Sequence, residues 1–394
     1  MFSSLQPIIT KVLEDIRSTG LYKPQRVIES RQGAKVVTQG KEVINFCANN
    51  YLGLAGSDVL VDAAKKALEQ YGYGLSSVRF ICGTQTVHKE LEQETACFLK
   101  KDAALIFGSC WEANEGLFAS VLGEEDAVIS DALNHASIID GLRLCKAERH
   151  VYAHMDLKDL EEKLRATQSK RMRCIVTDGV FSMEGSIAPL SGICGLAEKY
   201  DTLVVVDDSH ATGFMGAEGR GTHEYHHVED KVDVITTTYG KALGGATGGC
   251  VAGPKELIDL LTQRARTSLF TNALPPVVAG TTLFVLRYLA EHPELRERLW
   301  GNTKYFREKM REIGFRVPDS VHPIVPVMVG EGRAAQGMAE EMLNEGIYVI
   351  GFSYPVVPQG EARIRVQISA AHTVEQIDAL VAAFEKLGRK YGIV

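Results

Sequence analysis

Lys241 lies within a run of unusually small residues, TTTYGKALGGATGG, at positions 236–249. Glycine and alanine let neighbouring backbone approach closely, and a lysine that only faces solvent needs no such surroundings. A Walker A loop is excluded, because Ile235 stands where that motif requires glycine and Ala242 follows the lysine instead of serine or threonine. This stretch alone fits two interpretations equally well: a surface lysine on a glycine-rich turn, or a lysine that bonds covalently to a ligand.

Asp207 ends the apolar run of VVVDDSH, where open α/β sheets bind their ligands at the carboxyl ends of strands. Asp207, Asp208 and His210 could ligate a metal, but no further ligand with suitable spacing follows, so we expect no metal. A hydrolase triad of Asp207, Ser209 and His210 is excluded, because residues this close in sequence cannot reach one another in the required relay.

Pyridoxal phosphate is the cofactor whose chemistry uses these residue types together. It needs a lysine to form an imine, an acid to keep its ring nitrogen protonated, and a donor for its phenolic oxygen. Lys241, Asp207 and His210 match these needs in turn. We therefore interpret Lys241 as the imine-forming lysine.

The phosphate of such a cofactor requires an anion site. Ser109, Cys110 and Trp111 lie between an expected strand and an expected helix start, where backbone N–H groups and the helix dipole favour anions. An ordinary strand–helix loop fits the spacing equally well. His135, in SDALNHAS, could stack on a pyridine ring, although a lone histidine is more often structural.

Alternating apolar runs and helical patterns must position these residues. Continuous Val/Ile-rich runs separated by helical stretches predict parallel strands buried on both faces of a sheet. Such runs occupy 103–107, 127–130, 174–178, 202–207, 232–238 and 249–253. We expect a large α/β domain over residues 55–290.

The segments on either side of this domain have different hydrophobic patterns. Residues 1–54 predict an N-terminal helix and arm; the helix is amphipathic and does not resemble a signal peptide. Residues 291–394 alternate helix and strand patterns at shorter spacing, which predicts a smaller α+β domain. Thr373 and Gln376 fit a capping box at the start of its last helix.

Composition excludes several classes of protein. The 394 residues carry a net charge of −7, so the chain lacks the excess of basic residues typical of nucleic-acid-binding proteins. No apolar run is long enough to span a bilayer. The eight cysteines form no CxxC pair, so we expect reduced thiols and a cytoplasmic protein.

The sequence resembles the α-oxoamine synthase family of fold-type I pyridoxal-phosphate enzymes along nearly its whole length. The fold that the resemblance implies is a mostly parallel seven-stranded sheet flanked by helices, with a smaller α+β domain. The motifs that carry it are INFCANNYLGLA, SSVRFICGTQTVHKELE, SDALNHASIIDGLRLCKA, TDGVFSMEGSIAPL, VVVDDSHATGF, YGKALGGATGG and PVVPQGEARIRVQISAAHT.

The resemblance also implies roles for single residues in cofactor binding. Lys241 would hold the cofactor and then move the substrate's α-proton. Asp207 would pair with the pyridine nitrogen, and His210 with the phenolic oxygen. The other implied cofactor contacts are Ser182 assisting His210, His135 stacked on the ring and touching substrate, Cys110 and Trp111 at the phosphate end, and Thr238 nearby.

Four further residues complete the implied site. Thr271 and Asn272 would reach the phosphate in the neighbouring subunit, which implies a homodimer with shared active sites. Arg365 would clamp the amino-acid carboxylate, with Asn49 assisting. Two other positions, Glu184 and Tyr239, depart from the family's usual Asp and aliphatic residue, which puts fine substrate geometry in doubt.

The implied activity is the condensation of glycine with acetyl-CoA to 2-amino-3-oxobutyrate and coenzyme A, a reversible step of threonine breakdown with possible coupling to threonine 3-dehydrogenase. Three alternatives stay open. A sister synthase, such as 8-amino-7-oxononanoate synthase, would use another acyl-CoA or amino acid. An aminotransferase or aldolase could share the fold. A non-catalytic partner subunit or regulator would belong to a different class.

Overall fold

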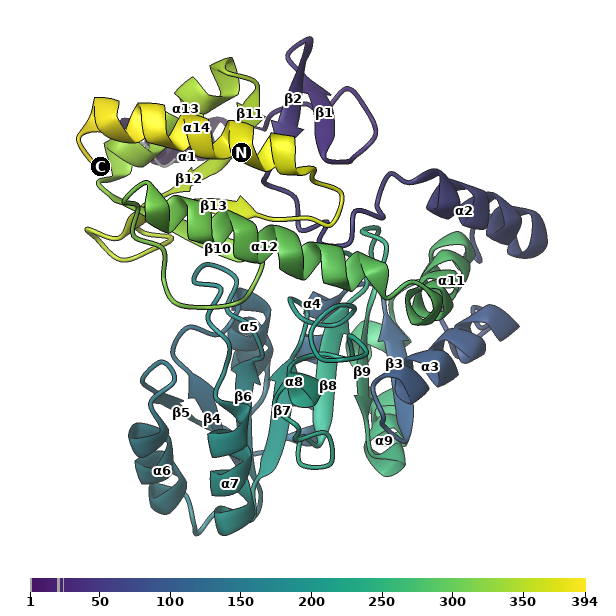
Figure 1. Ribbon diagram of the computed structural model, residues 1–394. Helices are drawn as coiled ribbons and strands as arrows, with labels where there is room; N and C mark the ends of the chain where they lie inside the picture. Colours follow the sequence, from purple (N-terminus) through teal and green to yellow (C-terminus); the bar gives the residue numbers. More distant parts are fainter. Residues whose placement is uncertain (1, 20–21, 24) are drawn as a thin grey trace.

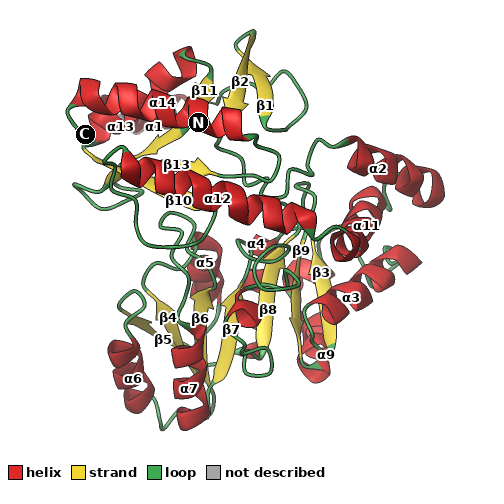
Figure 2. Cartoon of the chain, viewed as in Figure 1, coloured by secondary structure: helices red, strands yellow, loops and turns green. Residues whose placement is uncertain are grey.

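The computed structural model describes residues 2–19, 22–23 and 25–394. A large twisted sheet with helices on both faces fills the lower part of Figure 1, and a smaller body of helices and short strands lies above it. Helix α12 (Glu294–Glu312) runs along the boundary between them. Figure 2 shows the same arrangement by secondary structure.

The large sheet has seven strands in the order β3-β9-β8-β7-β6-β4-β5. Their bounds are β3 Ala103–Phe107, β4 Ala127–Asp131, β5 Glu148–Tyr152, β6 Arg173–Asp178, β7 Leu203–Asp207, β8 Val234–Thr238 and β9 Gly249–Gly253. The predicted mostly parallel, seven-stranded sheet is confirmed. Strand β9 is the exception to the parallel pairing, since it runs antiparallel to both β3 and β8. The connection from β8 to β9 is a loop without a crossover helix, so the chain has to return antiparallel, and this loop carries Lys241.

Alternate side chains of each central strand are buried on opposite faces of this sheet. On β7, Val204 and Val206 join one apolar cluster and Val205 joins the other. Helices α4, α5 and α9 pack on the Val205 face, and α3, α6, α7 and α11 supply the other cluster. The helices around the sheet are α2 Asp58–Tyr71, α3 Thr86–Phe98, α4 Cys110–Val121, α5 Ala136–Leu144, α6 Leu157–Ala166, α7 Leu190–Tyr200, α8 Thr222–Tyr225, α9 Lys255–Arg264, α10 Arg266–Leu269 and α11 Pro276–Glu291.

The smaller body contains two short sheets. One is antiparallel in the order β10-β13-β12, and the other has the order β1-β2-β11. In the second sheet β2 pairs in parallel with β11, so the segment after the first helix lies beside the C-terminal part of the chain. The remaining elements are α1 Phe2–Ser18, β1 Lys35–Thr38, β2 Lys41–Asn45, β10 Ile324–Gly330, α13 Gly332–Asn344, β11 Ile347–Tyr348, β12 Ile350–Phe352, β13 Ala362–Gln367 and α14 Val374–Tyr391.

Two details of the terminal helices follow from their sequences. The capping box predicted at α14 is confirmed, because Thr373 Oγ1 accepts from the Gln376 N–H while the Gln376 side chain accepts from the Thr373 N–H. Helix α1 is amphipathic as predicted, but none of its residues is buried. In the described part of the chain, every helix is too short or too polar to cross a lipid bilayer.

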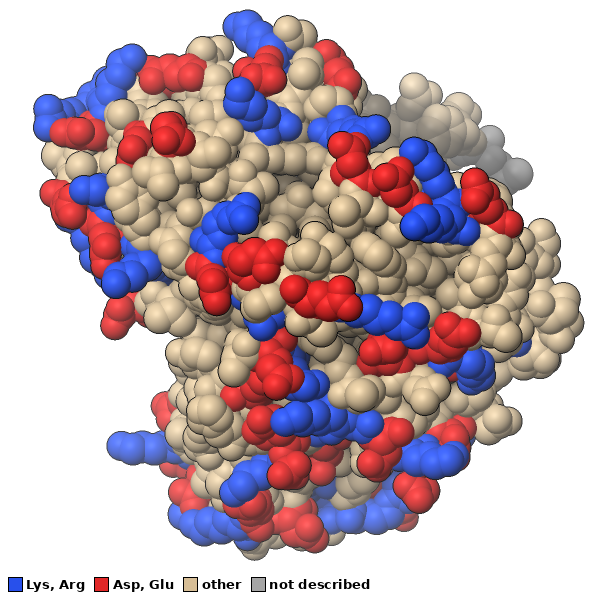
Figure 3. All heavy atoms as spheres, turned by 45° about the vertical axis from the view of Figure 1, so that its right-hand side comes forward, with Lys and Arg blue, Asp and Glu red and all other residues tan. Residues whose placement is uncertain are grey.

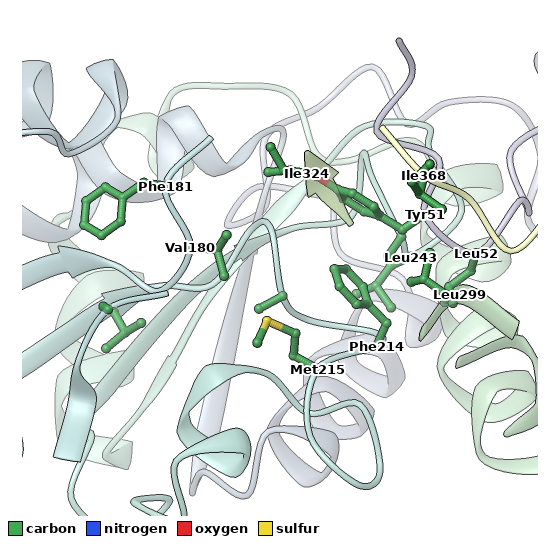
Figure 4. Close-up of a cluster of buried hydrophobic side chains, with 14 of the residues drawn as sticks. Tyr51, Leu52, Val180, Phe181, Phe214, Met215, Leu243, Leu299, Ile324 and Ile368 are labelled. Atoms are coloured by element: carbon green, nitrogen blue, oxygen red, sulfur yellow. The ribbon is translucent and has the colours of Figure 1, made fainter. Parts of the chain in front are cut away.

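An apolar cluster joins segments that are far apart in sequence at the junction of the two bodies. Figure 4 shows Tyr51, Phe214, Leu243, Leu299 and Ile324 converging there from the N-terminal segment, the large sheet's loops, α12 and β10. Such burial fixes the small sheets over the carboxyl ends of the large sheet's strands. On the face drawn in Figure 3, acidic and basic side chains are interspersed.

Candidate active site

The candidate site lies where the central parallel strands end. Asp178 ends β6, Asp207 ends β7, and the two residues are paired across the strands. Thr238 ends the next strand, β8. Because parallel strands present their carboxyl ends at one edge, the loops that follow them meet there.

Asp207 is a buried carboxylate with both oxygens anchored. Its Oδ2 accepts a hydrogen bond of 2.7 Å from Nδ2 of Asn114, and its Oδ1 accepts one of 3.0 Å from the backbone N–H of Ser209. Asp208 has a different environment: its oxygens accept from the backbone N–H and hydroxyl of Thr222 at 2.8 and 2.6 Å. Asp208 therefore holds a loop in place, while Asp207 faces the site.

Lys241 lies in the loop between β8 and β9 and is partly buried. Burial lowers the pKa of its ammonium, and the nearby carboxylate of Asp207 opposes that shift. In the described part of the chain, Lys241 makes no side-chain hydrogen bond or ion pair. The loop explains its small residues: Gly245 has φ 76°, and a Cβ there would lie 2.8 Å from the Cβ of Ala55.

The start of α4 lies beside this loop. Ser109 caps the helix by accepting from the N–H of Glu112 at 3.2 Å. Gly249 packs so tightly here that a Cβ would come within 2.4 Å of the Cys110 nitrogen. The Cys110 thiol points at Asp207, 3.6 Å from Oδ2, and burial raises the pKa of that thiol well above its ordinary value. Cys110 is thus held as a neutral thiol rather than a nucleophile.

Trp111 and His135 form an edge-to-face pair with ring centroids 5.9 Å apart. The His135 backbone N–H donates to Oδ2 of Asp178 at 2.8 Å, which fixes the start of α5 against the end of β6. Burial raises the pKa of Asp178 well above its ordinary value, and Asp207 raises it further. Thr238 organises the lysine loop, since its hydroxyl donates to the Gly248 carbonyl at 3.1 Å.

His210 is held from two sides after β7. Its Nδ1 lies 2.8 Å from the hydroxyl of the buried Tyr51, and its carbonyl accepts a 2.7 Å hydrogen bond from Nε2 of His322. Burial and the nearby Lys241 lower the pKa of His210 well below its ordinary value, so the ring is neutral at pH 7. His210 can then act as a fixed neutral hydrogen-bonding group.

Arg365 comes from β13 of the smaller body. One guanidinium N–H donates to the backbone carbonyl of Ser182 at 2.9 Å, and the group lies over the ring of Phe352. In the described chain it has no carboxylate partner, whereas Arg363, two residues earlier, is paired with Glu184 and Glu361. An unpaired guanidinium at a site edge is suited to bind a ligand carboxylate.

The remaining predicted residues divide into near and distant ones. Asn49 lies near Arg365's strand, because its Oδ1 accepts from Nε2 of Gln367 at 2.9 Å. Ser182 contacts Arg365 through its carbonyl, and the described chain has no hydrogen bond from its hydroxyl to His210. Asn272 pairs with the segment at Val78, and in the described chain no hydrogen bond joins Thr271 or Asn272 to another predicted site residue.

The two positions expected to depart from the family pattern, Glu184 and Tyr239, each have a defined partner in the structure. The Glu184 carboxylate lies 3.4 Å from the Arg363 guanidinium and so forms an ion pair beside the site. Tyr239 is buried, and its hydroxyl lies 2.9 Å from that of Thr95.

The family model described as aminotransferase class I and II matches residues 41–384. The chain belongs to the aminotransferase class I and II family. The narrower resemblance to the α-oxoamine synthases, which the motifs predicted, is confirmed by individual relatives.

Among them, 2-amino-3-ketobutyrate coenzyme A ligase of Escherichia coli (strain K12) is 54% identical over 389 residues, 98% of each chain. The human mitochondrial protein of that name is 52% identical over 392 residues, 99% of this chain and 94% of its own. The 8-amino-7-oxononanoate synthase of Thermosipho melanesiensis is 46% identical, covering 98% of this chain and 99% of its own. A lysine-to-alanine variant of a serine palmitoyltransferase from S. paucimobilis, solved with a bound PLP–myriocin aldimine, has a TM-score of 0.93 at 31% identity over 100% of both chains.

Sequence reasoning did not identify Asn114, Tyr51, Asp178 or His322. Asn114 had a detectable signal, since it follows Cys110 by one helical turn and so faces the same way. Tyr51 and His322 had none, because only the fold brings them to His210.

Proposed function

We propose that the protein is a pyridoxal-phosphate-dependent glycine C-acetyltransferase, which joins glycine to acetyl-CoA to give 2-amino-3-oxobutyrate and coenzyme A. The names of the curated relatives that match nearly the whole chain support this reaction. The observation that carries it is a pair of cations at one site, Lys241 beside Asp207 and Arg365 beside Ser182. Arg365 has no carboxylate partner, which suits an amino-acid substrate.

The side chains fit the chemical needs of pyridoxal phosphate. Lys241 would hold it covalently, Asp207 would face its ring nitrogen, and His210 its phenolic oxygen. The α4 N-terminus, with Cys110 and Trp111, would receive the phosphate. When bound, the cofactor supplies an electron sink that stabilises negative charge at the substrate's α-carbon.

The protein groups then have distinct tasks in the reaction. Arg365 holds the glycine carboxylate and so fixes which bond at the α-carbon faces Lys241. When the glycine amine replaces Lys241 on the cofactor, the freed Lys241 amine, whose pKa is lowered by burial, would take the α-proton. The α-carbon then forms a bond to the thioester carbonyl carbon, the C–S bond breaks, and coenzyme A leaves as a thiol. Passing that proton to the departing thiolate would leave Lys241 as a neutral amine that can hold the cofactor again.

A sister synthase with another acyl-CoA is the second candidate. It is favoured by the 46% identity to 8-amino-7-oxononanoate synthase over nearly the whole of both chains. Both candidates predict thiol release from an acyl-CoA in the presence of an amino acid, so they differ only in substrate choice.

We also propose a homodimer in which Thr271 and Asn272 serve the neighbouring subunit's phosphate. Asn272 pairs with the segment at Val78, and no hydrogen bond joins it to this chain's own site residues in the part that the structure describes. Large apolar side chains are exposed around that segment, as expected of a surface that another subunit covers. They are Tyr73, Phe80, Ile81 and Phe270.

The deciding experiment is an acyl-CoA panel assayed by free thiol release with glycine, alanine and serine. We expect kcat/KM to be highest for glycine with acetyl-CoA and to fall as the acyl chain lengthens. An added methyl in a close-fitting pocket changes the barrier by about 1–3 kcal/mol. A kcat/KM that rises with chain length, or alanine outperforming glycine, identifies a sister synthase. The cytoplasmic location and the coupling to threonine 3-dehydrogenase stay predictions.

A further inference from the structure

One asparagine connects two groups of the candidate site. Asn114 is fully buried on α4, and its Nδ2 donates two short hydrogen bonds, one of 2.7 Å to Oδ2 of Asp207 and one of 2.9 Å to Oγ of Ser137, with the Cys110 sulfur more distant at 3.9 Å. Ser137 Oγ also lies 2.8 Å from Nδ1 of His135. The chain of bonds therefore runs from the carboxylate at the end of β7 to the histidine at the start of α5.

The chemistry of these groups determines where each proton lies. An ionised carboxylate only accepts, so the NH₂ side of the Asn114 amide must face Asp207. The second amide hydrogen goes to Ser137, whose own hydroxyl hydrogen is then free to point at His135 Nδ1. The opposite amide orientation would set an oxygen against the carboxylate, although it would relieve the buried Asn114 Oδ1, which has no partner in the described chain.

A second donor converges on the same ring nitrogen. The backbone N–H of Ser137 donates to Nδ1 of His135 at 3.2 Å, and a backbone N–H cannot accept. Nδ1 must therefore be the unprotonated nitrogen. In the neutral ring the proton lies on Nε2, and burial, which lowers the pKa of His135, favours the neutral ring.

We propose that Asn114 is a positioning residue that orients Asp207 and, through Ser137, fixes His135 as an Nε2–H hydrogen-bond donor toward the substrate. The inference rests on the proposed function in placing a cofactor and a substrate between Asp207 and His135. While this hydrogen-bond network is intact, His135 cannot accept a proton at Nδ1. Its task is then to hold a substrate atom by donation, and Lys241 is left as the base.

The proton position is testable in the cofactor-free protein. Histidine labelled with ¹⁵N, with the His135 signal identified from a His135→Gln sample, should report a protonated Nε2 and an unprotonated Nδ1 in the wild type. Ser137→Ala removes the shorter of the two donors and leaves only the 3.2 Å backbone N–H, so a fraction of His135 protonated at Nδ1 should appear, while Ser137→Thr, which keeps the hydroxyl, should restore the wild-type pattern. A His135 protonated at Nδ1 in the wild type overturns the proposal.

The Asp207 end is tested through cofactor affinity. Removing a hydrogen bond to a charged group should weaken pyridoxal phosphate binding by about tenfold or more in Asn114→Ala. Asn302 is a matched control: it is also buried, and its Nδ2 also donates two hydrogen bonds, to the carbonyls of Ser369 and His372. Asn302→Ala should lower thermal stability but leave the cofactor dissociation constant unchanged.

These measurements separate the inference from the proposed function. Equal dissociation constants for wild type and Asn114→Ala would overturn the positioning role. If Asn114→Ala does not fold, the nearly isosteric Asn114→Asp serves instead, and it should weaken cofactor binding because a second carboxylate meets Asp207. A wild-type protein that binds no pyridoxal phosphate would contradict the proposed function, while the tautomer measurement would still stand.

Discussion

The hydroxyl of Tyr51 lies 2.8 Å from Nδ1 of His210 and joins the N-terminal segment to the loop after β7. Tyr51 is completely buried, so its hydroxyl depends on this partner. His210 in turn depends on Tyr51 to leave its other ring nitrogen available to the site.

Tyr51→Phe should therefore damage both stability and turnover. It leaves a buried ring nitrogen unsatisfied, which should lower the free energy of unfolding by about 1–3 kcal/mol, and kcat should fall because the proton of His210 is no longer fixed. Urea unfolding and steady-state kinetics measure the two effects. Tyr239→Phe is the matched control, since its buried hydroxyl bonds Thr95 in the core; it should lose stability but keep kcat. Equal kcat for Tyr51→Phe and wild type would contradict the role of Tyr51.

Lys241→Ala should keep the fold and abolish turnover. No large apolar group is removed, but the covalent attachment of the cofactor and the proton acceptor are lost together. The visible absorbance of the cofactor-loaded protein and the rate of thiol release report these losses. Lys231→Ala, which removes a surface lysine paired with Glu198, is the control and should behave as wild type. Turnover near the wild-type rate would refute the assignment of Lys241.

Arg365→Lys should raise the KM for glycine by about tenfold or more and leave the KM for acetyl-CoA unchanged. A lysine keeps the charge but cannot bind a carboxylate through two parallel N–H groups. Arg363→Lys is an informative comparison on the same strand, because Arg363 is committed to Glu184 and Glu361. It should lower thermal stability more than it changes glycine binding. An unchanged glycine KM in Arg365→Lys argues against the carboxylate clamp.

Shared active sites predict complementation between two inactive variants. Lys241→Ala and Asn272→Ala damage different parts of each site, so a mixed dimer should carry one site with both residues intact. Thiol release should appear on mixing once the subunits exchange. Each variant alone is the control. Subunit exchange can be verified by mass spectrometry of tagged subunits. If activity is not recovered once exchange is complete, the result would count against a composite site.

Stability should fall on acidification below pH 6.5. Burial lowers the pKa of His322 to about 3 and that of His372 to about 4, from 6.5 in the unfolded chain. Between these values only the unfolded state binds the proton, so each histidine removes up to about 1.4 kcal/mol per pH unit as the pH falls. The urea midpoint of the cofactor-free protein should be lower at pH 5.5 than at 7.5, and His372→Asn should reduce that difference. Equal midpoints at the two pH values would exclude this linkage.

The sequence predicted best those elements whose signal is local. The central strands of the large sheet are apolar on both faces, so their Val/Ile runs stand out, and the capping box of α14 is contained within four residues. Strand β5 was missed because Glu148–Tyr152 lies at the sheet's edge, where most of its side chains face solvent and need not be apolar. The hairpin β1–β2 was missed for a related reason: it is short, and its burial depends on β11, far along the chain.

The residues of the candidate site differ in the same way: some carry a local sequence signal and others do not. Lys241 and Asp207 could be singled out because each lies in a distinctive short motif at a strand end. Tyr51 contacts His210 only because the apolar cluster of Figure 4 brings the N-terminal segment against the loop after β7. Asn114 was overlooked because an asparagine in a helix carries no chemical signature until its partners are known.

The pairing of β2 with β11 has a consequence for biosynthesis. A ribosome releases β2 and all seven strands of the large sheet before it reaches Ile347 and Tyr348. During that interval the nascent chain presents an unpaired strand edge, which can recruit other nascent chains. The strand is short and carries Lys41 and Glu42, two charged side chains that discourage such recruitment until the native partner emerges.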